Sequence, residues 1–221
     1  MIITGINGSV RRGNCRLALE LFLEGARQEG ADTRIIDLGE LSLETCQGIC
    51  HDQCHPLDGQ NRLQPGGWHR CTRQDDGAGV LEQMVRSDGI VLASPVLFGN
   101  VSALLKTLME RSNALSSFAR GANQSFLKNK WGAALAVGGA RHAGQEITLQ
   151  SMVNYFMVLQ MLPVGLGEYQ APLGLSLVGD DVGSILKDRW TDYEIKEADA
   201  RTYLQAYGRK LAGQCRQDVL S

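Results

Sequence analysis

Long apolar runs are absent from this sequence, and so is any excess of positive charge. No segment approaches the roughly 20 consecutive apolar residues that a membrane-spanning helix needs, and the first residues lack the basic start and apolar run of a signal peptide. The formal net charge is -2, so no global positive field favours nucleic acid or an anionic membrane as a partner. We therefore expect a cytoplasmic protein that binds neither.

Familiar catalytic signatures are missing as well. The sequence has no GxxxxGK(S/T) motif, which disfavours a nucleoside triphosphatase, and no evident Ser/His/Asp or Cys/His arrangement. It also has no internal repeat and no low-complexity tract. What is present is an ordinary globular composition, with 43% hydrophobic and 21% charged residues over 221 positions. A chain of this length can bury a sizeable core as one domain.

Apolar residues recur at strand spacing and helix spacing in turn. Strands are expected at Met1–Gly5, Asp32–Leu38, Gly89–Ser94, Trp131–Val137 and Pro163–Gly167, and helices at Arg16–Gly30, Gly77–Ser87, Val101–Asn113, Gln145–Met161 and Tyr193–Arg216. Strands joined by a crossing helix lie parallel. The order therefore predicts a single α/β domain over residues 1–221, with a doubly wound, five-stranded parallel sheet in flavodoxin-like order. Ligands of such sheets bind at the carboxyl ends of the strands, where the strand order reverses.

The loop after the first expected strand has the composition of a phosphate site. It runs from Gly8 to Cys15 as GSVRRGNC and leads into a helix. Free backbone N–H groups and the helix dipole both favour an anion at such a position. The alternative is a glycine-rich turn with solvated arginines.

Two further strand-to-helix loops are unusual. The loop from Ser94 to Ser102 places apolar side chains and a Gly-Asn pair at a sheet edge, which a flat heteroaromatic ring would explain. The alternative is a buried turn in which Asn100 and Ser102 cap the next helix. The loop from Gly138 to Glu146 has glycines that allow close backbone approach and polar residues for recognition; the alternative makes it a turn and the first turn of a helix.

Together, the segments GSVRRGN, SPVLFGNVSALLK and GGARHAGQE resemble the NADPH-dependent FMN reductase superfamily, in particular its iron-sulfur flavoprotein branch. That branch has the similar patterns GSPRxxGNT, SPVYxGNVSA and GGxRxGGQE. The resemblance implies that the chain binds flavin mononucleotide (FMN). It places Ser9, Arg11, Asn14 and Cys15 around the phosphate, Pro95, Val96, Leu97, Phe98, Gly99 and Asn100 beside the isoalloxazine and ribityl chain, and Gly139, Arg141, Gly144 and Gln145 over the other edge of the ring.

One of these residues departs from the family pattern in a way that affects the chemistry. Cys15 stands where the family has a threonine or serine, whose hydroxyl would donate to the phosphate. A thiol is a weaker donor, so we expect FMN to be held less tightly. The alternative role for Cys15 is a reactive thiol with a lowered pKa at a helix N-terminus, which a bound phosphate would oppose.

Four of the six cysteines crowd into the segment 40–76, where the periodicity fails and a long loop is expected. They follow the pattern Cys46-x3-Cys50-x3-Cys54-x16-Cys71. Four thiolates suit a [4Fe-4S] cluster or a tetrahedral zinc site, and a reducing compartment disfavours disulfides.

The resemblance favours the [4Fe-4S] cluster with these four cysteines as metal ligands, although the family spacing is tighter, close to C-x2-C-x2-C. Three histidines of the same segment offer substitutes for a cysteine or would favour zinc: His51, His55 and His69. Free thiols or disulfides are the third alternative.

A flavin exchanges electrons in pairs or singly, whereas an iron-sulfur cluster carries one at a time. We therefore predict an FMN-dependent oxidoreductase that passes electrons between FMN, a [4Fe-4S] cluster and an electron-carrier protein or small redox acceptor. One alternative is an NAD(P)H-dependent FMN or quinone reductase with a structural cysteine loop. Another is a non-catalytic redox sensor or partner-binding module. The resemblance also implies a homodimer or homotetramer.

Overall fold

The computed structural model describes residues 1–48, 71, 73–116, 125–140, 142–167, 171–179 and 197–220. Its elements are the strands β1 (Ile2–Asn7), β2 (Asp32–Asp37), β3 (Gly89–Pro95), β4 (Trp131–Gly138), β5 (Leu162–Pro163) and β6 (Leu175–Val178), the helices α1 (Asn14–Gln28), α2 (Gly77–Val85), α3 (Ala103–Arg111), α4 (Gln145–Val158) and α6 (Glu197–Leu220), and the short 3-10 helices η1 (Leu38–Glu40) and η2 (Ser112–Leu115). None of the helices within these ranges is long and apolar enough to cross a membrane.

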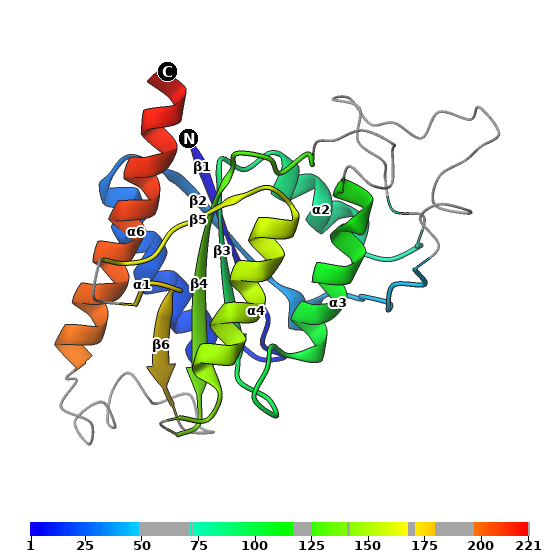
Figure 1. Ribbon diagram of the computed structural model, residues 1–221, viewed down its shortest axis with the longest axis horizontal. Helices are drawn as coiled ribbons and strands as arrows, with labels where there is room; N and C mark the ends of the chain where they lie inside the picture. The colour runs from blue at the N-terminus through cyan, green and yellow to red at the C-terminus, as the bar shows by residue number, and fades with distance from the viewer. Residues whose placement is uncertain are drawn as a thin grey trace.

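The strands form one parallel sheet in the order β2-β1-β3-β4-β5, with β6 also paired to β4. The chain runs from β1 outwards to β2 and then returns to β3 on the other side of β1, so the strand order reverses there. The predicted doubly wound, flavodoxin-like order is confirmed. The carboxyl ends of the strands, where ligands of such sheets bind, point downwards in Figure 1.

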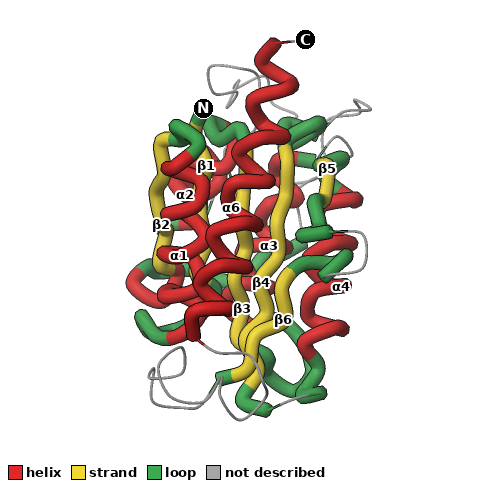
Figure 2. The backbone as a smooth tube through the Cα atoms, turned by 90° about the vertical axis from the view of Figure 1, so that its left-hand side faces the viewer, coloured by secondary structure: helices red, strands yellow, loops and turns green. Residues whose placement is uncertain are grey.

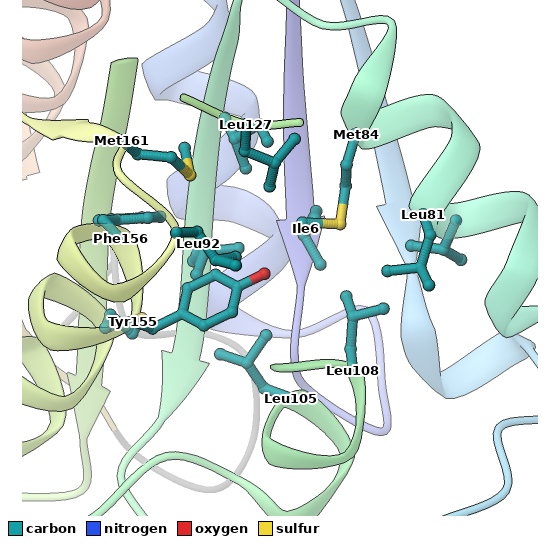
Figure 3. Packing of buried hydrophobic residues seen from close by; sticks show 14 of the residues in the cluster. Ile6, Leu81, Met84, Leu92, Leu105, Leu108, Leu127, Tyr155, Phe156 and Met161 are labelled. Carbon is teal, nitrogen blue, oxygen red and sulfur yellow. The ribbon is translucent and has the colours of Figure 1, made fainter. Parts of the chain in front are cut away.

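Helices cover both faces of the sheet (Figure 1). The helices α1 and α6 pack on one face, seen from the front in Figure 2, and α2, α3 and α4 pack on the other. Within β3, Val91 and Ala93 belong to the first core cluster, whereas Ile90 and Leu92 belong to the second, which Figure 3 shows. Because both faces are buried, the strand appears in the sequence as an unbroken apolar run.

Two short segments, and not one continuous strand, occupy the position beyond β4. β5 pairs with the beginning of β4 and β6 with its end. Between them, the hydroxyl of Tyr207 on α6 accepts a hydrogen bond from Ala134 N and donates one to Val164 O. A side chain thus satisfies buried backbone groups that a strand would otherwise pair. The prediction of a strand over Pro163–Gly167 was wrong beyond Pro163, and β6 was not predicted.

The other predicted strands and helices begin and end close to their predicted bounds. The final helix is described from Glu197 to Leu220, so its predicted start at Tyr193 lies outside the described residues. Most of the cysteine-rich segment, residues 49–70 and 72, also lies outside them. The two ends of that segment are described.

Candidate functional site

The path of the β1–α1 loop (residues 8–13) is fixed by Asn7, the last residue of β1. Its Nδ2 donates to Asp37 Oδ1 at 2.9 Å and to Arg11 O at 3.4 Å, and its Oδ1 accepts from Ser9 N at 3.1 Å. Asp37 ends β2 and is in register with Asn7. The end of one strand therefore shapes the loop that follows its neighbour. Sequence reasoning missed both residues, because the predicted first strand ended at Gly5, before Asn7, and the register of β1 against β2 was not predicted.

The β1–α1 loop also packs directly against β3 and the loop that follows it. Gly8 N donates to Ala93 O at 2.8 Å, and Ser102 Oγ donates to Gly8 O at 2.6 Å. A Cβ at Gly8 would lie 2.8 Å from Leu105 Cβ, so no larger residue fits without a shift. Ser102 Oγ also accepts from Leu105 N at 3.0 Å, which confirms its predicted alternative role as the N-cap of α3.

Three arginines lie at or beside this loop, and two of them pair with carboxylates. Arg12 and Arg16 both pair with Asp37, and Arg12 pairs with Glu40 as well. The hydrogen bond to Glu40 raises the pKa of the Arg12 guanidinium. Arg11 is exposed and contacts no carboxylate in the described part of the chain. Its charge is therefore available to an anionic ligand.

The N-terminus of α1 also favours an anionic ligand at this loop. The N-cap residue is a glycine, Gly13, so no side chain of its own caps the helix, and the first turn of the helix holds no acidic residue. Backbone N–H groups at such an end favour an anion, and the helix dipole adds to the effect. The start of α1 and Arg11 together form the features of a phosphate site.

Cys15 lies in the first turn of α1 and is only 3% exposed. Burial raises the pKa of its thiol to about 12, partly offset by a backbone hydrogen bond. The thiol is therefore protonated at neutral pH. A lowered pKa and a thiolate nucleophile, the alternative role considered from the sequence, are contradicted by this burial.

The loop after β3 forms a tight hairpin that exposes apolar side chains. Leu97 N donates to Asn100 O at 3.0 Å, and Asn100 N donates to Leu97 O at 3.1 Å. Between them Phe98 and Gly99 have φ values of 50° and 75°, as in a type I′ turn. Leu97 is 52% exposed and Phe98 is fully exposed. This hairpin offers apolar surface to a flat ring at the edge of the sheet.

Gln145, which the resemblance placed over the ring, uses its side chain to shape the loop after β4. It is 1% exposed; its Oε1 accepts from Ala143 N at 2.9 Å, and its Nε2 donates to Ala140 O at 2.7 Å. Gly144 has a φ of 106°, and a Cβ there would lie 2.5 Å from Gly99 Cα. The loops after β3 and β4 therefore touch. Arg141 lies outside the described residues.

A cavity of about 260 Å³ opens where these loops meet. Its lining residues are Ser9, Arg11, Arg12, Gly13, Asn14, Cys15, Pro95, Val96, Leu97, Val137, Gly138, Gly139 and Gly179. All four residues predicted around the phosphate line it. Five other predicted residues lie on the adjoining loops and do not line it: Phe98, Gly99, Asn100, Gly144 and Gln145. The volume suits the phosphate and ribityl end of a nucleotide, with the exposed hairpin beyond it available to a ring.

A larger cavity of about 510 Å³ lies elsewhere, between α3, η2 and α4 and beside Cys46. Its lining is mainly apolar, and its two charged residues, Lys106 and Glu110, pair with each other at 3.1 Å. It therefore offers no uncompensated cation. Its size alone does not make it the nucleotide site, because a phosphate needs the positive charge found in the smaller cavity.

The two ends of the cysteine-rich segment are joined to each other. Asp76 N donates to Ser42 O at 3.1 Å, and Ser42 N donates to Asp76 Oδ2 at 2.8 Å. Glu44 N donates to Asp75 Oδ2 at 2.7 Å. The long loop thus leaves from, and returns to, one place beside α2.

A buried arginine at the end of α3 holds this junction. The guanidinium of Arg111 donates to both oxygens of Asp75, at 2.6 and 2.8 Å, and to Glu44 O at 2.9 Å. Its Nε donates to Cys71 Sγ at 3.1 Å. The hydrogen bonds from Arg111 lower the pKa of Asp75 to about 2, and those to Asp75 and Cys71 raise the pKa of Arg111 despite its burial. Arg111, Asp75, Glu44 and Cys71 are called the arginine anchor below.

Residues 1–174 match the family described as NADPH-dependent FMN reductase. The chain belongs to this family. It is 36% identical to an iron-sulfur flavoprotein of Methanocaldococcus jannaschii, over 85% of this chain and 88% of the relative. It is 38% identical to an iron-sulfur flavoprotein of Methanosarcina thermophila, over 75% and 78%. A WrbA-like flavodoxin of Agrobacterium tumefaciens shares the fold, with a TM-score of 0.57 at 18% identity over 98% of each chain.

Membership of the FMN reductase family identifies the chain as a flavin-dependent oxidoreductase. The resemblance of three loops to this family is therefore confirmed. The relatives named iron-sulfur flavoproteins confirm the resemblance to that branch as well. Its individual site residues, by contrast, stay predictions. The cavity described above lies at the sheet edge where the fold places its ligand.

The cysteine ligand set is only partly within the described residues. Cys46 and Cys71 are described and free, whereas Cys50 and Cys54 lie outside. The described ranges contain no group of three or more His, Cys, Asp or Glu side chains that could hold a metal ion. Cys46 Sγ accepts from Gly48 N at 3.4 Å, so both described sulfurs accept an N–H hydrogen bond. Hydrogen bonds of this kind are characteristic of cysteine sulfurs that bind iron-sulfur clusters. The chemistry of the described thiols therefore fits a [4Fe-4S] cluster.

Proposed function

We propose that this flavin-dependent oxidoreductase passes electrons between FMN, a [4Fe-4S] cluster and an external carrier protein or small acceptor. The observation that carries the proposal is the cavity at the sheet edge. It joins Arg11, which has no carboxylate partner among the described residues, and the N-terminus of α1 to the ends of β3 and β4. A nucleotide phosphate and its attached chain suit that arrangement. The relatives named iron-sulfur flavoproteins support the second centre.

At the flavin site, the chain's own contribution is binding and orientation. Ser9, Arg11 and Asn14 would hold the phosphate, and Cys15 would offer it a weak donor. The hairpin at Leu97 and Phe98 would cover one part of the ring. FMN would supply exchange of an electron pair or of single electrons. The predicted contacts of Pro95, Val96, Gly99, Asn100, Gly139, Arg141, Gly144 and Gln145 belong to the same proposal.

At the cysteine site, the proposed ligands are Cys46, Cys50, Cys54 and Cys71. Two observations support them: both described sulfurs are free, and each accepts an N–H hydrogen bond. A bound cluster would supply one-electron transfer. The chain's residues would fix the ends of the segment and shield Cys71, which is 8% exposed.

The visible spectrum of anaerobically purified protein, with iron and sulfide analysis, tests both centres. We expect flavin bands together with broad brown absorption and about four irons per chain, as a [4Fe-4S] cluster requires. Flavin bands with no iron would overturn the cluster and leave the flavoprotein standing. Zinc in place of iron would do the same. Absence of flavin after reconstitution with excess FMN would overturn the proposal at its first step.

A second candidate is an NAD(P)H-dependent FMN or quinone reductase with a structural cysteine loop. The family description, which names NADPH, favours it. It predicts rapid anaerobic bleaching of the flavin by NADH or NADPH. The first proposal instead predicts slow bleaching by these donors and fast reduction by a protein carrier such as reduced ferredoxin. Stopped-flow absorbance at the flavin maximum distinguishes the two.

We further propose a homodimer or homotetramer in the cytoplasm. Three apolar side chains of α4 support self-association, because they are more than half exposed: Ile147, Met157 and Val158. Light scattering on the purified holoprotein should give a mass at least twice the 24.1 kDa of the chain. The variant Val158→Asp should lower that mass, whereas a monomeric wild-type protein would contradict the proposal.

A further inference from the structure

Arg111 is a charged residue on the buried and otherwise apolar side of α3. Leu105 and Leu108 form the buried side of α3, and Arg111 continues the same stripe at 1% exposure. A fully buried cation is costly unless it is paired and hydrogen-bonded. What Arg111 contacts is therefore informative about why a cation is there.

The terminal nitrogens and Nε of the guanidinium have different partners. The two terminal nitrogens donate to the carboxylate of Asp75 in a bidentate pair, and one of them also donates to Glu44 O. Nε is left, and it donates to Cys71 Sγ at 3.1 Å. A Cβ at Gly77 would lie 2.8 Å from the guanidinium, so the start of α2 also packs on it closely. The planar fork is thus fixed, with one N–H directed at sulfur.

Asp75 needs no further partner to satisfy it. Besides Arg111, its oxygens accept from Glu44 N at 2.7 Å and from Gly77 N at 3.0 Å. The bond from Glu44 N joins the two ends of the segment without Arg111, whereas the bond from Gly77 N lies within one end. Among the described residues, the bond from Arg111 to Cys71 is the contact that links this ion pair to a proposed cluster ligand.

We propose that Arg111 is a positioning residue of the cysteine site: its Nε–H holds the Cys71 sulfur, and its charge raises the reduction potential of the cluster bound there. This inference rests on the proposed cluster. One-electron reduction adds one negative charge to the site. A buried cation with an N–H on a ligand sulfur stabilises that charge, and hydrogen bonds to sulfur are among the factors that set cluster potentials.

A purely structural role for Arg111 leads to a different prediction. Variants of Arg111 and Asp75 distinguish that structural role from an effect of charge on the cluster. Arg111→Gln removes a positive charge and Asp75→Asn removes a negative one, while both break the same ion pair. If the anchor only holds the segment in place, both variants loosen it and change the cluster in the same direction. If the charge of Arg111 acts on the cluster, the potential falls in Arg111→Gln and rises in Asp75→Asn.

The experiment is an anaerobic redox titration of the holoprotein, in which electron paramagnetic resonance of the reduced cluster gives its midpoint potential. We expect Arg111→Gln to lower the ratio of reduced to oxidised cluster at fixed potential at least tenfold, about 59 mV for a one-electron couple. Asp75→Asn should shift it the other way. Arg73→Gln is the matched control, because Arg73 pairs with Glu44 at the same junction but is 25% exposed. Its shift should stay under threefold.

Equal potentials in wild type and both variants, or shifts of the same sign, overturn the role of Arg111 while the proposed function stands. A wild-type protein without iron overturns the cluster and this inference together. If Arg111→Gln binds no iron, Asp75→Asn alone decides: a higher potential supports the proposal, and an equal or lower one overturns it. Iron and FMN contents measured on each preparation identify which case applies.

Discussion

Two regions of this molecule hold an aspartate against arginine side chains, and they do so in different surroundings. At the β1–α1 loop, Asp37 meets Arg12 and Arg16, whose side chains are 60% and 23% exposed. At the arginine anchor, Asp75 meets Arg111, and the two side chains are 1% and 0% exposed. Solvent therefore reaches the first ion pairs, whereas the second ion pair is buried.

The two regions also differ in how many residues hold them in place. The β1–α1 loop is held by the amide of Asn7, the backbone of Gly8 and the hydroxyl of Ser102 in addition to its ion pairs. The junction of the cysteine segment depends on Asp75 and Arg111 for most of its side-chain bonds. Loss of one side chain should therefore be tolerated at the flavin edge and costly at the anchor.

The largest effect that we expect is from Arg111→Met. It leaves the Asp75 carboxylate buried without its cation, so the free energy of unfolding should fall by about 3–5 kcal/mol. Arg16→Met is the matched control at the other region, where Asp37 keeps Arg12 and Asn7; its loss should be about 1 kcal/mol. Urea unfolding of the cofactor-free chain, followed by circular dichroism, measures both. Equal losses would contradict the contrast between the two regions.

The cause of that loss can be tested by removing the other charge as well. In the double variant Arg111→Met/Asp75→Leu, no unpaired carboxylate remains buried. Replacing a buried ion pair by apolar side chains is often neutral, so much of the stability should return. A double variant no more stable than Arg111→Met would place the cost in lost packing.

The next effect concerns pH. The hydrogen bonds from Arg111 lower the pKa of Asp75 from its ordinary 3.8 to about 2 in the folded chain. A depressed folded pKa contributes stability that is present above the unfolded pKa and is lost as pH falls through the folded one. Between about pH 5 and pH 2, wild type should therefore lose about 2 kcal/mol more than Asp75→Asn. Urea unfolding at several pH values measures the difference, and parallel curves would refute it.

The contrast between the regions also explains what the sequence allowed us to predict. The alternation of strands and helices is a local signal, and it predicted the sheet order and the three loops at one edge. The network of Asn7 and Asp37 was missed because it depends on the register of β1 against β2. Register follows from packing across the sheet and is not marked by spacing along the chain.

The arginine anchor left a fainter signal. Arg111 follows Leu105 and Leu108 at a spacing of three, so a charged residue sits on the apolar stripe of a predicted helix. Such a residue needs a buried partner, and the stripe points to its presence without naming Asp75, 36 residues away. The split fifth strand was missed for a similar reason, since Tyr207 on a distant helix completes it.

A smaller effect is expected from charge removal at the flavin edge. Arg11→Gln should weaken FMN binding about tenfold, since a charge-assisted hydrogen bond contributes roughly 1.5–3 kcal/mol and water replaces part of it. Arg12→Gln should change affinity less than threefold, because Arg12 is paired with Asp37 and Glu40. Fluorescence titration of the apoprotein with FMN measures both. Equal effects would show that the ion pairs of Arg12 do not set the two arginines apart.

The smallest effect concerns Cys15, which is buried with a protonated thiol at the start of α1. Cys15→Ser replaces the sulfur by a hydroxyl of similar shape that donates more strongly, so FMN should bind about two- to fivefold more tightly. Riboflavin, which lacks the phosphate, should bind wild type and variant equally. A gain for riboflavin as well would place the effect in packing and remove Cys15 from the phosphate site. Because the thiol is buried and protonated, iodoacetamide at about pH 8 should also leave Cys15 unmodified, as mass spectrometry of the native protein would record.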